Sequence, residues 1–268
     1  MLNLWGVLNE ILSYNGLKKT KKTSNYFERY QMAVKKKQIR KVLNLKIRQL
    51  NDIIADIDSL LTEMETVFYR VCIFGSARIQ PDTEFYRDVE KLAEGLAMEG
   101  ADIVTGGGPG LMEAANKGAK KGTSGARSIG LPIQLPFESD ANSHLDVKSE
   151  HKRFSSRLDE FMRISHAVVI TPGGIGTLLE LFYTWQLLQV QHIKPRPFIL
   201  LGESGMWQAL IDFMKEWPLK EKLMSASDIE SITICHTVEE ALSALRIDMD
   251  KFRKEQEQAL AEKRARNP

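Results

Sequence analysis

The chain has 268 residues with 43% hydrophobic content, which is enough for one α/β core with length left for an extension. No apolar run reaches the roughly 18 to 20 residues that a membrane span needs, and the N-terminus lacks the basic start and apolar core of a signal peptide, so we expect a cytoplasmic protein with no membrane partner. The formal net charge of +2 hides an asymmetry, because residues 1–48 hold twelve Lys or Arg against two Glu, or +10, and the remainder sums to −8.

Such a basic segment can bind an anionic partner such as nucleic acid or a membrane surface. Few aromatic side chains cluster there for base stacking, however, and nucleic acid is therefore not the partner we expect. We favour a solvated helix face that docks on the acidic body of a neighbouring subunit.

The first part of the chain, residues 1–66, is expected to be a helical extension. A short amphipathic stretch at 2–14 and a polar linker at 18–23 precede a segment from 26 to 69 without Gly or Pro. In that segment apolar residues alternate by four and three, as in a coiled-coil seam: Leu43, Ile47, Leu50, Ile54, Ile57, Leu61 and Met64. The seam can pack on the remainder of the chain, but we favour a long helix at the interface of a homo-oligomer.

Strand and helix patterns alternate through the next part, residues 67–248. Short apolar runs predict strands at 71–74, 102–104, 128–132, 167–170, 197–201 and 231–235. Helical patterns fall between and after them at 83–99, 110–121, 150–165, 176–190, 205–216 and 237–247. This alternation predicts a doubly wound, mainly parallel Rossmann-like sheet with helices on both faces. The charged residues 249–268 are expected to form a solvated helical tail.

The two cysteines, Cys72 and Cys235, both fall within these predicted strands. Neither has the spacing of a metal ligand, so we expect reduced core residues.

Two glycine-rich loops follow predicted strands and precede predicted helices. The first is Thr105-Gly106-Gly107-Gly108-Pro109-Gly110, and the second is Thr171-Pro172-Gly173-Gly174-Ile175-Gly176-Thr177. A third loop, Gly75-Ser76-Ala77-Arg78, follows the first predicted strand. Ligands of open α/β sheets bind beyond the carboxyl ends of the strands, so the three loops are expected to share one crevice.

Glycines at a strand-to-helix junction let backbone N–H groups approach an anion, and the helix dipole favours a phosphate there. Neither loop matches the dinucleotide fingerprint or the P-loop, which disfavours a redox enzyme or an NTPase. The Glu180 carboxylate, one turn into the helix after the second loop, would repel the same phosphate, so its presence there calls for a chemical task of its own. Acid/base or cation-stabilising chemistry is such a task, so an enzyme is the first expectation.

Both glycine motifs, extended through Asn116 in the first and through Glu180 in the second, resemble those of the LONELY GUY (LOG) family, whose older label is possible lysine decarboxylase. Members hydrolyse the N-glycosidic bond of nucleoside 5′-monophosphates to a free base and ribose 5-phosphate. The resemblance covers about 71–237 and does not extend to residues 1–66. It implies a purine nucleoside 5′-monophosphate, AMP-like or a cytokinin riboside monophosphate, as substrate.

The resemblance also implies roles for individual residues. Glu180 would be the catalytic carboxylate and Arg157 the second catalytic residue. Substrate or phosphate would be held by Gly173, Gly174, Ile175, Gly176 and Thr177, by Gly107 and Gly108, and by Ser76 and Arg78. Many members have lysine after that arginine, whereas this chain has Leu158, and Arg153 one helical turn earlier is a candidate replacement. Neither a metal nor a cofactor is expected.

The chemistry is consistent with these residue types. Breaking a ribose C1′–N bond builds positive charge on the sugar, which a carboxylate such as Glu180 stabilises while it orients the attacking water. Arg157 stays charged and suits a clamp on phosphate or on Glu180. Glu180 can alternatively do no more than complement the helix dipole. The alternative function is a non-catalytic carrier of a nucleotide or nucleotide-like cofactor.

Three further residues are weaker candidates for this site. Glu113 falls early in the helix after the first glycine loop, and His144 and His151 flank the segment that leads to Arg157. Lone histidines are more often surface residues than ligands.

Overall fold

The structure is a computed structural model that describes residues 32, 36–37, 39–51, 53–54, 57, 68–122, 124–133, 141–202 and 204–266. The chain divides into two compact units, residues 1–63 and 64–268. The predicted stretches at 2–14 and 18–23 lie outside the described residues, as do Leu61 and Met64 of the seam. The limits 1–66 and 67–248 stay a prediction.

Within the first unit, residues 39–51 are helical, as the Gly-free and Pro-free pattern predicts. The described seam residues Leu43, Ile47, Leu50, Ile54 and Ile57 are each at least half exposed.

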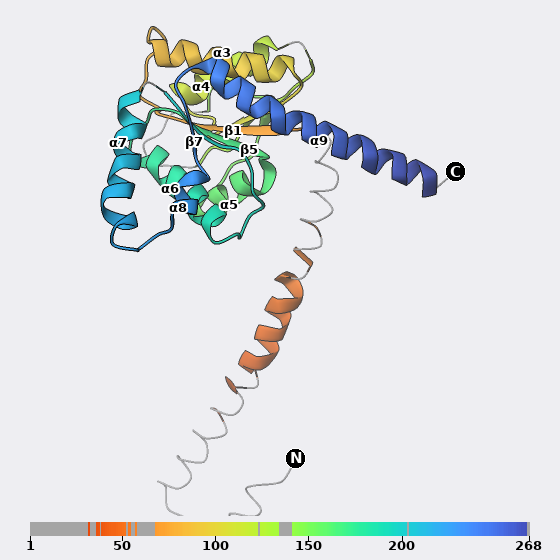
Figure 1. Cartoon of the computed structure of the whole chain (residues 1–268). Coiled ribbons are helices and arrows are strands. Elements are labelled where there is room, and N and C mark those ends of the chain that lie inside the picture. The colour runs from red at the N-terminus through yellow and green to blue at the C-terminus, as the bar shows by residue number, and fades with distance from the viewer. Residues whose placement is uncertain are drawn as a thin grey trace, which may run out of the picture. The chain divides into compact units, whose positions relative to one another are not determined.

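The second unit is built on one parallel sheet of seven strands in the order β4-β3-β2-β1-β5-β6-β7. Figure 1 shows helices on both faces of this sheet. The strands are β1 (Arg70–Phe74), β2 (Asp102–Thr105), β3 (Ser128–Gly130), β4 (Val147–Lys148), β5 (Ala167–Ile170), β6 (Phe198–Leu201) and β7 (Thr233–Cys235). The direction of travel reverses between β1 and β5, where β1 pairs with both β2 and β5. The predicted doubly wound sheet is confirmed, and this reversal is its topological switch point.

The helices follow the strands in alternation, as predicted. They are α3 (Glu84–Met98), α4 (Leu111–Lys121), α5 (Phe154–Ile164), α6 (Ile175–Gln189), α7 (Ser204–Met214), the π-helix η1 (Lys215–Leu219), α8 (Ala226–Glu230) and α9 (Val238–Arg266). The two-residue strand β4, the π-helix and α8 were not predicted.

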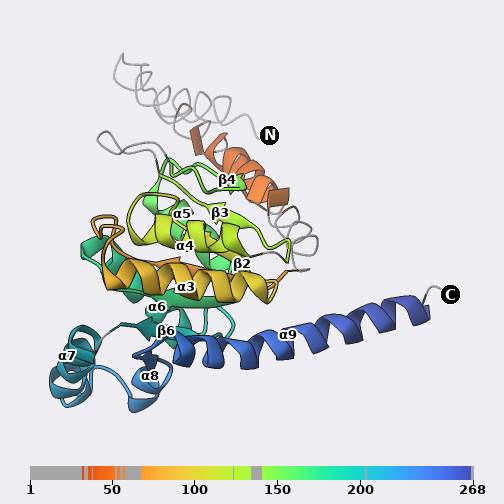
Figure 2. The ribbon, with the colours of Figure 1, turned by 90° about the horizontal axis from the view of Figure 1, so that it is seen from above.

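In the central strands, successive side chains supply two separate cores on opposite faces of the sheet. Val71 and Ile73 of β1 pack with α3, α4 and α9, whereas Cys72 and Phe74 pack with α5, α6 and α7 on the other face. The alternation follows from the period of two in a strand. Figure 2 shows α3 and α4 lying together along the sheet and α5 beyond it. The two cysteines are free and buried, as predicted.

Helices α3 and α4 approach each other closely through small residues. A Cβ atom added to Gly118 of α4 would overlap the carbonyl oxygen of Glu90 of α3 and lie 3.0 Å from the Cβ of Ala93. Lys117 and Lys121 of α4 both pair with the Glu90 carboxylate beside this contact. The two helices are therefore joined by packing and by charge.

Helix α9 is continuous through the expected division at residue 249. Met249 is buried in the core and the ring of Phe252 lies edge-on to Tyr69 and His166. Tyr69 donates a hydrogen bond to Asp248 at 2.6 Å. Burial lowers the pKa of His166 to about 4, so this contact is made by a neutral ring. The start of the predicted tail thus belongs to the body of the second unit.

Among the described residues, no helix combines the length and the apolar character that crossing a bilayer would take.

Candidate active site

The three glycine-bearing loops meet in one cavity at the carboxyl ends of β1, β2 and β5. The cavity, here called the strand-end cavity, has a volume of about 470 Å³. Its polar lining comes from the loops and from two facing helices: Ser76, Arg78, Gly106, Gly108, Arg157, Gly174, Gly176, Thr177 and Glu180. Its apolar lining is supplied by Met112, Ile133, Phe154, Leu158, Ile175 and Leu179. The position at the switch point of the sheet is where ligands bind in this class of fold.

The second glycine loop presents the N-terminus of α6 to the strand-end cavity. Gly174 is the N-cap residue and makes no side-chain cap, and Gly174, Ile175 and Gly176 are exposed. Thr177 is buried, and any Cβ at Gly173 would overlap its side chain. A helix N-terminus without a side-chain cap offers backbone N–H groups and a positive dipole end to an anion.

Glu180 projects from the second turn of α6 into the same cavity and is half-buried. Burial raises the pKa of its carboxyl from 4.5 to about 7, and the Arg157 guanidinium lowers it in part. A carboxyl whose pKa lies near neutrality and that faces a cation in a cleft has the properties of an acid/base group. Complementing a helix dipole would not require this burial.

Arg157 of α5 faces Glu180 across the cavity and is fixed by backbone oxygens. Its Nε donates to the Leu131 carbonyl at 2.6 Å, and its Nη2 donates to the Gly106 carbonyl at 3.4 Å. Its guanidinium lies 5.2 Å from the centroid of the Phe161 ring. Arg157 therefore holds a fixed charge beside Glu180 and also holds the first glycine loop.

The first glycine loop reaches the cavity through Gly106 and Gly108. Gly107 is not among the residues that line the cavity, and its N–H donates to the Thr105 hydroxyl at 2.9 Å. Gly110 has a φ of +67°, and a Cβ there would overlap the Ser76 carbonyl, so only glycine fits. Leu111 N–H donates to that carbonyl at 2.9 Å and ties this loop to the one after β1.

The loop after β1 places Ser76 and Arg78 in the lining, as the sequence predicted. Ser76 N–H donates to the Pro172 carbonyl at 3.1 Å, and its hydroxyl accepts from the Arg78 N–H at 3.1 Å. Ser76 thus links the loop after β1 with the loop after β5.

Other candidates from the sequence lie elsewhere. Gly173, Glu113, His144 and His151 are outside the lining of the strand-end cavity. Arg153 is the exposed N-cap residue of α5 and also lies outside this lining.

Leu158 is buried in the apolar wall beside Ile133 and Phe154. Ile175 of the same wall belongs to the second glycine loop, whereas Ile133, Phe154 and Leu179 could not be picked out from the sequence, since single apolar residues from separate segments give no motif.

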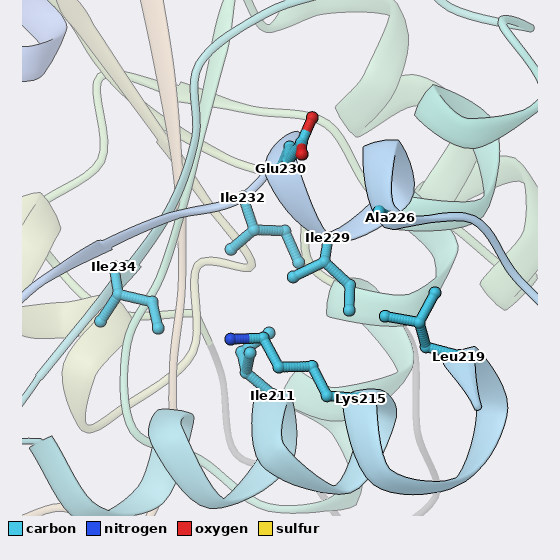
Figure 3. A pocket seen from close by; sticks show the side chains of 8 residues that line it. All are labelled: Ile211, Lys215, Leu219, Ala226, Ile229, Glu230, Ile232 and Ile234. Atoms are coloured by element: carbon cyan, nitrogen blue, oxygen red, sulfur yellow. The ribbon is translucent and has the colours of Figure 1, made fainter.

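A second cavity lies between α7, η1, α8 and β7, with a volume of about 420 Å³ (Figure 3). Its lining is mostly apolar, with four isoleucines, Leu219 and Ala226 beside Lys215 and Glu230, and the Glu230 carboxylate points away from the isoleucines in Figure 3. It has neither a glycine loop nor a buried carboxyl, so the strand-end cavity is the candidate active site.

The chain is similar to known proteins over this body. A protein-family model described as "Possible lysine decarboxylase" matches residues 112–245. A probable cytokinin riboside 5′-monophosphate phosphoribohydrolase, LOGL3 of Oryza sativa subsp. japonica, is 32% identical over 187 residues, which are 68% of this chain and 85% of the relative. A pyrimidine/purine nucleotide 5′-monophosphate nucleosidase of Escherichia coli K12 is 33% identical over 138 residues, which are 47% of this chain and only 30% of that longer protein.

Among solved structures, the molybdenum cofactor binding protein of Rippkaea orientalis has a TM-score of 0.50 at 20% identity, covering 68% of this chain and 96% of that one. This likeness concerns the fold alone. The family model and the rice relative confirm the resemblance that the glycine motifs predicted, and the chain belongs to the LOG family, labelled possible lysine decarboxylase.

Proposed function

We propose that this protein hydrolyses the N-glycosidic bond of a purine nucleoside 5′-monophosphate to a free base and ribose 5-phosphate. The observation that supports it best is Glu180, a carboxyl with a pKa near 7 that shares one cavity with Arg157 and with the open N-terminus of α6. The names of the rice and Escherichia coli relatives describe the same class of reaction.

In this proposal the substrate phosphate binds at the N-terminus of α6, on the N–H groups of Gly174, Ile175 and Gly176 and on the Thr177 hydroxyl. Glu180 stands one helical turn further along α6, so a ribose bound through its phosphate lies over the carboxylate. Binding energy from the phosphate thereby orients the reacting carbon.

Cleavage of the C1′–N bond leaves positive charge on the ribose, and the ionised Glu180 stabilises this charge. Its carboxylate also accepts a proton from the water whose oxygen bonds to C1′ as the C1′–N bond breaks. The departing base takes up a proton from solvent, and Glu180 returns its proton to solvent. Arg157 favours the ionised form of Glu180 and stays charged throughout. The apolar wall with Leu158 and Phe154 is the surface on which the base packs.

The test is release of free base from a panel of nucleoside 5′-monophosphates, measured by chromatography. We expect adenine from AMP, and loss of that release in Glu180→Gln while AMP still binds. Glu160→Gln is the matched control, because Glu160 is a carboxylate of α5 that pairs with Arg163 outside the strand-end cavity. Binding without turnover in the wild type would support the alternative of a non-catalytic carrier, and full activity in Glu180→Gln would refute the assigned role.

We further propose a cytoplasmic homo-oligomer with the N-terminal helix at its interface. The two free thiols, Cys72 and Cys235, suit a reducing compartment. The seam residues spaced by four and three along 43–57 are exposed on their own helix, and the partner that this spacing fits is the same helix of a second copy.

A further inference from the structure

The inference concerns the side chains behind the first glycine loop, and it rests on the proposed function. Thr105, Asn116 and Ser128 are fully buried polar residues at the ends of β2 and β3 and on α4. With Asn142, which enters from a distant part of the chain, they form one hydrogen-bonded group. Buried polar groups that are all paired fix a single geometry.

The bonds of this group run from β3 to the glycine loop. Asn116 Nδ2 donates to the Ser128 hydroxyl at 2.9 Å, and Asn116 Oδ1 accepts from the Thr105 hydroxyl at 2.7 Å. The Thr105 oxygen in turn accepts from Gly107 N–H at 2.9 Å. Asn142 Nδ2 donates to Asn116 Oδ1 at 3.0 Å.

Asn142 also binds two carbonyl groups of the loop. Its backbone N–H donates to the Gly107 carbonyl at 2.8 Å, and its Nδ2 donates to the Gly108 carbonyl at 2.9 Å. Its Oδ1 accepts from His144 N–H at 3.1 Å. Because a carbonyl can only accept and an N–H can only donate, these backbone partners determine which way the Asn142 amide is turned.

These bonds decide which groups of the loop can face a ligand. The Gly106 carbonyl is bound by Arg157 and the Gly107 and Gly108 carbonyls by Asn142, so all three oxygens are held by donors. In a planar trans peptide the N–H points opposite to the C=O. Holding the Gly107 carbonyl toward Asn142 therefore directs the Gly108 N–H to the other side of the loop, and Gly108 lines the strand-end cavity.

We propose that Asn142, supported by Asn116, is a positioning residue that keeps the carbonyl oxygens of Gly107 and Gly108 out of the substrate site and the Gly108 N–H turned toward it. A carbonyl rotated into the cavity would repel the oxygens of a bound nucleotide, whereas an N–H attracts them. Asn142 acts through the loop and does not itself line the cavity.

Asn142→Asp is the sharpest test, because it keeps the shape and the backbone N–H while it replaces the donor by a carboxylate oxygen. That oxygen would face two acceptors, the Gly108 carbonyl and Asn116 Oδ1. His144→Ala is the matched control, since the bond from residue 144 to Asn142 uses the backbone N–H and survives the change. Far-UV circular dichroism and a thermal unfolding curve establish that each variant is folded.

The first measurement is amide hydrogen exchange of the segment 105–111, followed by mass spectrometry without any ligand. We expect exchange at least ten times faster in Asn142→Asp than in the wild type, with α3 and the His144→Ala variant unchanged. Exchange at the wild-type rate would overturn the proposal. Because no substrate is used, this result does not depend on whether AMP is hydrolysed.

The second measurement is steady-state hydrolysis of AMP. We expect KM to rise at least ten-fold in Asn142→Asp while kcat changes less than three-fold, because Glu180 stands on α6 and not on this loop. Asn142→Ala should also raise KM with little change in kcat, but by a smaller factor than Asn142→Asp. If the wild type hydrolyses AMP and KM is unchanged in Asn142→Asp, the positioning role is refuted; if the wild type hydrolyses no monophosphate, the proposed function fails and the exchange experiment alone decides.

Discussion

The raised pKa of Glu180 predicts how turnover depends on pH. With a pKa of about 7, roughly a tenth of Glu180 is ionised at pH 6 and roughly nine tenths at pH 8. If the ionised carboxylate stabilises the developing charge on the ribose, kcat/KM should increase about ten-fold between these values, because kcat/KM reports groups of the free enzyme. A carboxyl with its ordinary pKa would be fully ionised across this range and would give no increase.

The assay is AMP hydrolysis at substrate concentrations well below KM, from pH 5.5 to 8.5 at constant ionic strength. The phosphate group of the substrate itself titrates near pH 6. A second variant is therefore needed to show whether the increase in kcat/KM with pH comes from Glu180 or from the substrate. Arg157→Met removes the cation that lowers the pKa of Glu180, and we expect the rising limb to move to higher pH in the remaining activity. A flat profile would refute the reasoning, as would a decrease toward pH 8 or a limb that stays in place in Arg157→Met.

The same pKa makes an independent prediction for folding stability. A carboxyl whose pKa is higher in the folded state than its ordinary 4.5 destabilises the fold as the pH rises from 4.5 to 7, by up to about 3 kcal/mol at 1.36 kcal/mol per pH unit. Glu180→Gln cannot ionise. Its free energy of unfolding in urea should therefore exceed that of the wild type at pH 8 and equal it near pH 4.5. Equal stability at both pH values would contradict the raised pKa.

Three further predictions concern the loops and the N-terminal extension. Thr177→Ala should weaken AMP binding relative to adenosine, whereas Thr177→Ser, which keeps the hydroxyl, should bind both as the wild type does; equal loss for both ligands would argue against a phosphate contact. Gly110→Ala should lower the urea midpoint and AMP affinity together, because its Cβ would overlap the Ser76 carbonyl at a φ of +67°. Deleting residues 1–66 should reduce the mass measured by light scattering, and an unchanged mass would refute the interface.

Most of the fold could be predicted because strands and helices of this body differ clearly in pattern. The β-branched run at 167–170 and the Gly and Pro residues beside the strands give boundaries within a few residues of the observed ones. Strand β4 was missed because Val147 and Lys148 are exposed and form too short a run. A helical tail was predicted for 249–268, but its first residues were expected to be solvated because the segment is polar, whereas Met249 is buried and Phe252 packs against the core.

The position of the site was also accessible from sequence, since three loops follow parallel strands whose carboxyl ends must share one edge. The orientation of single peptide groups was not. Gly107 was expected to bind the ligand, yet its N–H is taken by Thr105, a bond that no glycine spacing reveals. Asn142 was missed for a similar reason, because it lies 34 residues from Gly108 and has no motif of its own.

The close contact of α3 with α4 has a consequence for how a nucleotide enters. Gly118 packs against Glu90, and the Leu111 N–H donates to the Ser76 carbonyl. The loops after β1 and β2 therefore cannot separate without breaking both of these contacts. We therefore expect any widening of the strand-end cavity on the side of Phe154, which begins α5 and is half exposed. We expect a nucleotide to enter and leave past Phe154 while the loops after β1 and β2 stay in place.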